Sequence, residues 1–235
     1  MLHEFSRTEM LIGKSGIEKL SKAKVLIFGI GGVGSYVVEA LARSGVGTLT
    51  LVDNDEVVIS NINRQLVALH STVGKFKTEV AKERIKDINP DILVHTYQTF
   101  YNVETSDLFD FKEYDYIVDA IDTVSSKLLI IEQAKVANTP SISCMGAGNK
   151  LDATRFEITD IAKTSVCPLA KTIRLELRKR KIKKVKVLYS KEPPIKIIET
   201  AKEAKGKQTV GSISYAPATA GLMIAGEVIK ELINE

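Results

Sequence analysis

A glycine-rich segment near the start of the chain limits what the chain can fold into. The segment Gly29-Ile-Gly-Gly-Val-Gly34 follows the apolar run Lys24–Phe28, and residues 34–44 carry apolar side chains at helical spacing. In such a strand–turn–helix unit the glycines allow a tight turn, a close approach of backbone to phosphate and close packing of helix on sheet. The helix N-terminus adds partial positive charge. The candidate nucleotide-binding residues are Gly29, Gly31, Gly32 and Gly34, and the loop alone leaves NAD, FAD and ATP open as ligands.

Short apolar runs alternate with helical patterns through the first two-thirds of the chain. The expected strands are residues 24–28, 48–52, 93–96, 116–118 and 141–143, and the expected helices are residues 34–44, 74–89 and 123–138. Strands that are apolar on both faces and alternate with helices indicate a doubly wound, mostly parallel sheet. We therefore predict an α/β fold of the Rossmann-like kind.

The pattern changes after residue 148. Here the expected elements are strands at 155–159 and 185–188, a basic helix at 169–181, a polar loop at 192–211 and a closing helix at 218–233. We therefore expect a core over residues 1–160 and a C-terminal basic helix and strand extension over residues 161–235. The extension is expected to pack on the same domain.

Composition narrows the class of protein. The 235 residues are 44% hydrophobic and 26% charged, which is typical of a soluble globular chain. The net charge of +4 is uneven, because residues 1–162 sum to −5 and residues 163–235 to +9. The basic end predicts an anionic partner. Two cysteines are too few for a disulfide framework or a four-cysteine zinc site. No signal segment or membrane span is evident, so we expect a cytoplasmic location and no membrane partner.

Polar and cationic residues follow the second expected strand. Asp53, at its end, is placed to accept hydrogen bonds from ribose hydroxyls. The residues that follow are Asp55, Asn61, Arg64, Gln65 and Lys77. Cations in this position can offset the charge of a triphosphate as pyrophosphate leaves, whereas a nicotinamide or flavin cofactor has no such need. Asp122 is expected at the end of the fourth strand, where it could hold Mg²⁺ together with phosphates.

Taken together, these elements resemble the ThiF/MoeB/ubiquitin-activating superfamily over about residues 5–160. The matching pieces are Ser6-Arg7, the GxGGxG loop, LVDND, NxNRQ, GKxK and DAIDTVSSK. The resemblance implies that Asp53 binds the adenosine ribose and that Asp122 serves Mg-ATP. It also implies that the phosphates are engaged by Asn61, Arg64, Gln65 and Lys77.

The same resemblance implies a homodimer and a catalytic set. An N-terminal arginine, matched here by Arg7, reaches the site of the partner subunit in that superfamily. The catalytic set it implies is Arg7, Arg64, Lys77 and Asp122. Lys127 matches the basic residue that closes the DAIDTVSSK element. Residues 1–160 then read as an ATP-binding adenylation core.

Other details resemble one branch of the superfamily, the tRNA threonylcarbamoyladenosine dehydratases. The chain lacks the two CxxC pairs of ThiF and MoeB, and it carries FSRTEMLIG, GIGGVGSYVVEALARSGVG, NINRQLVAL, DINP, GAG and DIAKT. The branch implies ATP-dependent adenylation of the threonyl carboxylate of a modified adenosine beside the tRNA anticodon. A nitrogen of the same nucleoside then closes a ring and expels AMP. A sulfurtransferase-type protein is a candidate partner.

Three rival interpretations remain. The first is adenylation of the C-terminus of a ubiquitin-like sulfur carrier, which the missing CxxC pairs and the basic end disfavour. The second is an NAD- or FAD-dependent oxidoreductase, which the NxNRQ and GKxK elements disfavour. The third is a non-catalytic scaffold that keeps only the glycine loop, which intact Arg64, Lys77 and Asp122 disfavour.

Two further features have alternative interpretations. A run of cations between residues 174 and 186 is either a solvated helix face or a surface that contacts tRNA phosphates. Its candidate contacts are Arg174, Arg178, Arg180, Lys181, Lys183 and Lys184. Cys144 ends an apolar run and is expected in the core. Cys167 precedes Pro168 and a helix, so it is either a structural thiol or a nucleophile that forms a thioester.

Overall fold

A seven-stranded sheet forms the centre of the computed structural model, which describes residues 3–198 and 210–234. The strand order is β3-β2-β1-β4-β5-β7-β6. All neighbouring strands are parallel except β6 and β7, which are antiparallel. The strands are β1 Lys24–Phe28, β2 Thr48–Val52, β3 Leu93–Tyr97, β4 Tyr116–Asp119, β5 Ser141–Cys144, β6 Phe156–Asp160 and β7 Lys186–Ser190. The predicted α/β, mostly parallel fold is confirmed.

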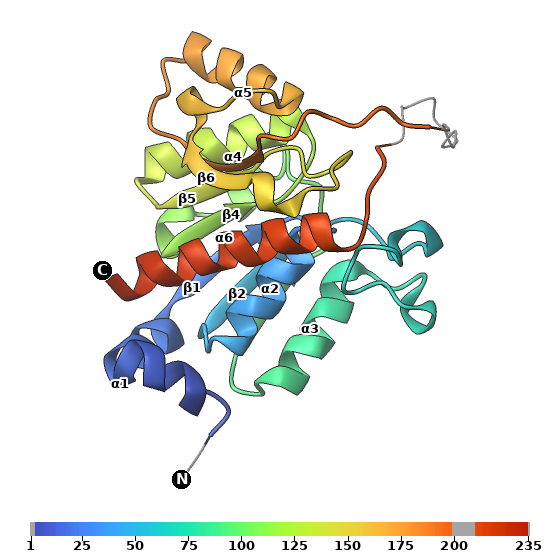
Figure 1. The fold of residues 1–235 in the computed structure, drawn as a ribbon. Helices are drawn as coiled ribbons and strands as arrows, with labels where there is room; N and C mark the ends of the chain where they lie inside the picture. Colours follow the sequence, from blue (N-terminus) through green and yellow to red (C-terminus); the bar gives the residue numbers. More distant parts are fainter. Residues whose placement is uncertain (1–2, 199–209, 235) are drawn as a thin grey trace.

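Helices cover both faces of this sheet (Figure 1). Within the described residues the α-helices are α1 Ser6–Lys22, α2 Gly34–Arg43, α3 Lys77–Ile88, α4 Val124–Ala137, α5 Pro168–Lys179 and α6 Tyr215–Asn234. Helix α6 lies across α2 and also contacts α1, while α4 packs against α5. Short 3₁₀ helices lie at Ile59–Asn61, His70–Thr72, Ser106–Leu108, Phe111–Glu113, Ala153–Arg155 and Ile161–Lys163.

The strand β1 shows why the central strands are apolar on both faces. Val25 and Ile27 enter the core cluster that contains residues of α1, α2, α3 and α6. Leu26 and Phe28 enter a second cluster with residues of α4 and an aromatic group from the segment after β3. Because side chains alternate along a strand, each face of β1 is buried under its own layer of helices.

Several boundaries differ from the sequence expectations. Helix α1 is absent from the pattern-based expectations, and a kink at Gly13, where φ is +73°, interrupts its helical periodicity. Helix α3 begins at Lys77 because Phe76 adopts extended backbone and pairs with Glu56. Strand β4 ends at Asp119, so Asp122 lies in the following loop and not at the strand end. Of the polar loop at 192–211, residues 199–209 lie outside the described residues.

The extension after residue 160 joins the central sheet. Strand β7 pairs with β5 on one side and with β6 on the other, so residues from both parts of the chain share one sheet. Within the described residues, no helix is long and apolar enough to cross a membrane.

The glycine loop is packed too closely for larger residues at two positions. Gly29 has a φ of +87°, and a Cβ there would lie 2.8 Å from the main-chain oxygen of Ala120. A Cβ on Gly34 would lie 1.7 Å from the main-chain oxygen of Gly29. The turn therefore requires a left-handed residue at its start and a residue without a side chain where α2 begins.

We expect Gly34→Ala to lower the free energy of unfolding by about 2–3 kcal/mol or more, because the clash is with backbone that cannot move aside cheaply. Gly226→Ala in α6 is the matched control, since no atom lies within 4 Å of its added Cβ. That control should raise stability by up to about 1 kcal/mol. Urea unfolding measures both, and equal stabilities for the two variants would contradict the expectation.

Candidate active site

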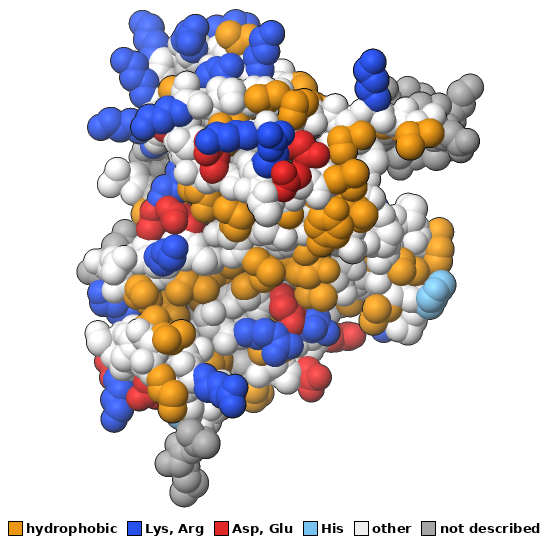
Figure 2. Space-filling model, in the orientation of Figure 1, with side chains coloured by type: hydrophobic (Ala, Val, Ile, Leu, Met, Phe, Trp, Pro, Cys, Tyr) orange, Lys and Arg blue, Asp and Glu red, His pale blue; other side chains and the backbone are white. Residues whose placement is uncertain are grey.

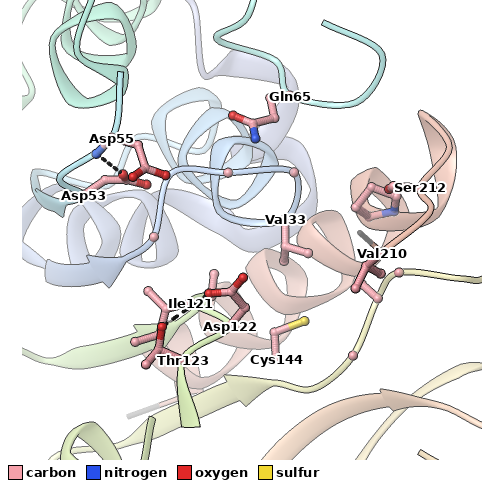
Figure 3. Close-up of a pocket in the computed structure, with 18 of the residues that line it drawn as sticks. Val33, Asp53, Asp55, Gln65, Ile121, Asp122, Thr123, Cys144, Val210 and Ser212 are labelled. Carbon is pink, nitrogen blue, oxygen red and sulfur yellow. Dashed lines mark hydrogen bonds between the residues drawn. The ribbon is translucent and has the colours of Figure 1, made fainter. Parts of the chain in front are cut away.

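A cavity of about 1260 Å³ lies at the carboxyl ends of the central strands, where ligands bind in sheets of this kind. Its walls come from the glycine loop, the loops after β2, β4 and β5, the start of α5 and residues near the start of α6. Figure 3 shows Asp53 and Gln65 along one side of the cavity and Asp122 and Cys144 along the other. One cavity therefore holds most of the sequence-predicted nucleotide residues.

Asp53 ties the glycine loop to the end of β2. Its Oδ2 accepts a hydrogen bond from the Ile30 main-chain N–H at 2.6 Å. Its Oδ1 accepts one from the Asp55 N–H at 2.8 Å, which Figure 3 shows. Burial raises the pKa of Asp53, and the nearby Lys77 ammonium and these two N–H groups partly offset that rise. Asp53 lines the cavity, and its carboxylate has lone pairs beyond those that accept these two bonds.

Two cations stand beside the glycine loop. Lys77 is buried, and its Nζ lies 2.7 Å from Asp55 Oδ2. Arg64 is half-buried, and its Nη1 donates to Ser60 O and to Asn63 Oδ1, both at 2.8 Å. No carboxylate of the described residues pairs with Arg64, so its guanidinium keeps donors for an anionic ligand.

Gln65 and Asn61 supply polar groups between these cations and the loop. Gln65 is buried, and its Oε1 has no hydrogen-bond partner among the described residues. Asn61 is also buried, and within the described part of the chain its Oδ1 accepts a single long bond of 3.3 Å, from the Val58 N–H. Leaving a buried acceptor unpaired costs about 1–3 kcal/mol. A ligand that donates a hydrogen bond to Gln65 would relieve that cost.

Asp122 is exposed at the cavity wall and only loosely held. Its Oδ1 accepts from Thr123 Oγ1 at 3.5 Å. Among the described residues, no group of three or more His, Cys, Asp and Glu side chains could hold a metal ion by itself. Magnesium commonly binds one or two carboxylates and completes its shell with phosphate oxygens and water. Asp122 fits that kind of site.

A buried ion pair lies beneath Asp122. Lys127 and Asp119 are both almost fully buried, and Lys127 Nζ lies 3.0 Å from the Asp119 carboxylate. Lys127 also donates to the main-chain oxygen of Ile121 at 2.9 Å, and Asp119 accepts from the Ile121 N–H at 3.3 Å. Ser143 Oγ donates to the other Asp119 oxygen at 2.5 Å. Both main-chain groups of Ile121 are thus fixed directly before Asp122.

The two cysteines both line the cavity and both are buried. Cys144 belongs to the main core cluster, as predicted, and burial raises the pKa of its thiol to about 12. Cys167 is the N-cap of α5, and its Sγ accepts from the Ala170 N–H at 3.5 Å. Cys167 therefore caps the N-terminus of α5 through its sulfur atom.

Other predicted residues lie outside this cavity. Gly34 packs beneath it, and Arg7 is exposed on α1. The candidate tRNA contacts lie on α5 and in the segment that follows it, where Figure 2 shows cations gathered at the top of the molecule. Arg174 donates to Thr164, and Arg180 pairs with Glu132 at 2.8 Å. The side chains that stay exposed without a partner among the described residues are Arg178, Lys181, Lys183 and Lys184.

Sequence reasoning missed several residues of the site. Asp119 and Ser143 lie in strands that are otherwise mostly apolar, and no motif marks them as site residues. A carboxylate in the run Tyr116–Asp119 does, however, indicate that a buried partner pairs with it. Lys150, Phe100 and Tyr101 also line the cavity, and no local motif marks them.

Comparison with known proteins identifies the relatives of this chain. A sequence model described as the ThiF family matches residues 5–235. The chain belongs to the ThiF family. The resemblance predicted from the motifs is thereby confirmed.

Within the family, the chain is similar to the tRNA threonylcarbamoyladenosine dehydratase of Bacillus subtilis (strain 168). The two are 46% identical over 245 aligned residues, which cover all of this chain and 96% of that protein. The fold is similar to the crystal structure of the Escherichia coli tRNA N6-threonylcarbamoyladenosine dehydratase TcdA in complex with ATP, with a TM-score of 0.89 and 33% identity over 98% of this chain and 94% of that chain. The AMP complex of the same enzyme gives a TM-score of 0.90 at the same identity and coverage.

The buried ion pair gives a stability prediction for this ThiF-family chain. Lys127→Met leaves the Asp119 carboxylate buried without its counterion, so we expect a loss of about 3–5 kcal/mol in the free energy of unfolding. Adding Asp119→Asn to that variant removes the unpaired charge and should recover much of the loss. Urea unfolding of both proteins measures the effect, and a double variant no more stable than the single one would contradict it.

Proposed function

We propose that this chain is a tRNA threonylcarbamoyladenosine dehydratase that uses ATP to activate the threonyl carboxylate and close it into a ring. The proposal depends chiefly on one observation: the chain matches a dehydratase along its whole length and gathers Arg64, Lys77, Asp122 and the glycine loop around one cavity. The nucleotide-bound structures of the similar enzyme support ATP as the co-substrate.

In this proposal the glycine-loop side of the cavity holds ATP. The N-terminus of α2 and the loop face the phosphates, and Asp53 binds the ribose hydroxyls. Asn61, Arg64, Gln65 and Lys77 contact the triphosphate. Asp122 would hold Mg²⁺, which neutralises phosphate charge when it is bound. The weakly held carboxylate of Asp122 supports this arrangement.

The chemistry follows from the charges. A carboxylate oxygen of the threonyl group attacks the α-phosphorus of ATP, the bond to the β-phosphate oxygen breaks and pyrophosphate leaves. Arg64 and Lys77 stabilise the charge that develops on the phosphates. A nitrogen of the same nucleoside, which loses a proton, then attacks the activated carbonyl carbon. AMP departs with the former carboxylate oxygen, so the nucleoside loses the elements of one water.

This sequence of steps needs no nucleophile from the protein. The attacking nitrogen and the activated carbonyl belong to one nucleoside, and such proximity replaces much of what a covalent intermediate would supply. Cys167 is buried and caps α5. We therefore assign Cys167 a structural role in place of a thioester.

The proposal extends to partners and location. We propose a cytoplasmic homodimer in which Arg7 of one subunit completes the site of the other, since Arg7 is exposed and does not line the cavity of its own chain. Residues 1–160 serve as the adenylation core and residues 161–235 as an extension that carries tRNA. A sulfurtransferase-type protein stays a candidate partner by family resemblance.

Three exposed lysines after α5, Lys181, Lys183 and Lys184, form a cation cluster that suits this tRNA-carrying role. Cys167, at the start of α5, lies on the cavity wall, whereas Lys181, Lys183 and Lys184 follow the end of the helix. The helix has 12 residues, which is about 18 Å of length. The cluster can therefore contact backbone phosphates at a distance from the nucleoside in the cavity.

The function is tested by incubating the protein with ATP, Mg²⁺ and tRNA that carries uncyclised threonylcarbamoyladenosine. We expect AMP release and a nucleoside lighter by one water, read by mass spectrometry. Asp122→Ala should lower AMP release at least about 100-fold while leaving stability unchanged, because Asp122 is exposed. Asp91→Ala, another exposed carboxylate, is the control. AMP release that requires a carrier protein instead of tRNA would refute the proposal.

The tRNA surface is tested by salt dependence. Lys181→Ala/Lys183→Ala should weaken tRNA binding and make the slope of log Kd against log salt shallower by about 0.7–0.9 for each phosphate that the variant no longer neutralises. The control is Lys112→Ala/Lys230→Ala, which removes two exposed lysines from other parts of the surface. Filter binding across a salt series measures both, and identical slopes for the two variants would exclude this surface.

A further inference from the structure

Lys150 is a buried cation on the cavity wall that the nucleotide assignments leave unused. Its exposed fraction is 4%, and it lies in the segment between β5 and β6. Its Nζ donates to the main-chain oxygen of Glu192. No salt bridge joins it to a carboxylate of the described residues. Burial lowers the pKa of its ammonium, and the nearby Cys167 and Glu192 side chains partly offset that decrease.

The nearest acidic side chain does not neutralise Lys150 directly. The Glu192 carboxylate accepts the Leu151 N–H at 3.1 Å and the Asp152 N–H at 3.0 Å. Glu192 is itself fixed by Ser190, whose Oγ accepts from the Glu192 N–H at 3.0 Å. Glu192 thus anchors the chain that follows Lys150 and offers that lysine its carbonyl oxygen.

The other buried lysines of the site are compensated. Lys77 pairs with Asp55 at 2.7 Å, and Lys127 pairs with Asp119 at 3.0 Å. A buried charge without a counterion is unfavourable, and proteins relieve it by pairing the charge or neutralising the group. Lys150 has no direct ion pair among the described residues, and its one hydrogen bond, to the Glu192 main-chain oxygen, leaves its ammonium two donors for an anion that enters the cavity.

The place of Lys150 separates it from the phosphate side. The glycine loop follows β1 and the Arg64 segment follows β2, whereas the Lys150 segment follows β5. In the sheet β2 and β5 are three strand positions apart, which corresponds to about 14 Å. Near Lys150 the chain is closely packed, because a Cβ added to Gly148 would lie 2.3 Å from Val210 Cγ1.

We propose that Lys150 binds the carboxylate of the acceptor substrate and thereby selects a carboxylate at the wall of the cavity that lies across from the glycine loop. This inference rests on the proposed function, because it takes the threonyl carboxylate as the acceptor. One donor of the ammonium holds one carboxylate oxygen, and the other oxygen is left to face the α-phosphate.

The test compares two RNA ligands with two variants. The ligands are an anticodon-arm oligonucleotide that carries threonylcarbamoyladenosine and the same oligonucleotide with the carboxylate converted to its methyl ester. Binding is measured by fluorescence anisotropy in the presence of a non-hydrolysable ATP analogue. Wild-type protein should prefer the carboxylate by about 10- to 100-fold, the usual range for a hydrogen bond to a charged group.

Lys150→Met should abolish that preference while leaving affinity for the ester and for the ATP analogue unchanged. Lys163→Met, which alters an exposed lysine in the C-terminal part of the chain, should keep the preference. A Lys150→Met protein that still prefers the carboxylate would overturn the inference and leave the proposed function standing. Wild-type protein that binds neither oligonucleotide would overturn the proposed function first.

A second measurement guards against misfolding. The pKa of Lys150 is lowered in the folded protein, so its charged form destabilises the fold below that folded pKa, and the penalty fades as pH rises toward the unfolded value of 10.5. Lys150→Met should therefore be at least as stable as wild type at neutral pH, and the difference should shrink in alkali. A large loss of stability at neutral pH would show that the lysine serves the fold and would contradict the inference.

Discussion

The buried ion pair between Asp119 and Lys127 holds together the parts of the site that come from different strands. Removing two charges from water is costly, so a buried ion pair needs a close, well-aligned contact and further hydrogen bonds to its remaining donors and acceptors. Here Ser143 and both main-chain groups of Ile121 make these further hydrogen bonds. The position of the Ile121 residue directly before Asp122 is therefore fixed by buried core residues and not by other residues of the loop. Ala120, which begins the same loop, packs against Gly29 and so couples the Asp122 loop to the glycine turn.

Positively charged side chains lie on two sides of the cavity, an arrangement that suits the transfer of AMP from one anion, ATP, to another, a carboxylate. Lys77 pairs with Asp55, so the side of the cavity that we propose for the phosphates carries less net positive charge than its cations alone would give it. Arg64 keeps its guanidinium free of carboxylates among the described residues. Asp53 bonds the main-chain N–H of Ile30 within the glycine loop. Lys150 supplies positive charge at the far side. Adenylation has to bring a carboxylate up to a phosphate, and cations on both sides reduce the repulsion between them.

Much of the fold was predictable because it depends on local patterns. The alternation of apolar strands and helices indicated the parallel sheet, and the glycine loop indicated the place of the cavity. Arg64 and Lys77, which line the cavity, could be singled out from the sequence because a motif surrounds each of them. Asp119, Ser143 and Lys150 were missed because their roles arise from contacts between segments distant in the chain. Helix α1 was missed because the kink at Gly13 breaks its period.

The central claim is that this cavity transfers AMP onto a carboxylate of the tRNA nucleoside. It is tested most directly with tRNA whose threonyl carboxylate carries ¹⁸O in both oxygens, incubated with unlabelled ATP. If the carboxylate attacks the α-phosphorus, one labelled oxygen leaves with AMP, and mass spectrometry should find AMP heavier by one ¹⁸O. Unlabelled AMP, or label in phosphate with ADP as the other product, would contradict the account.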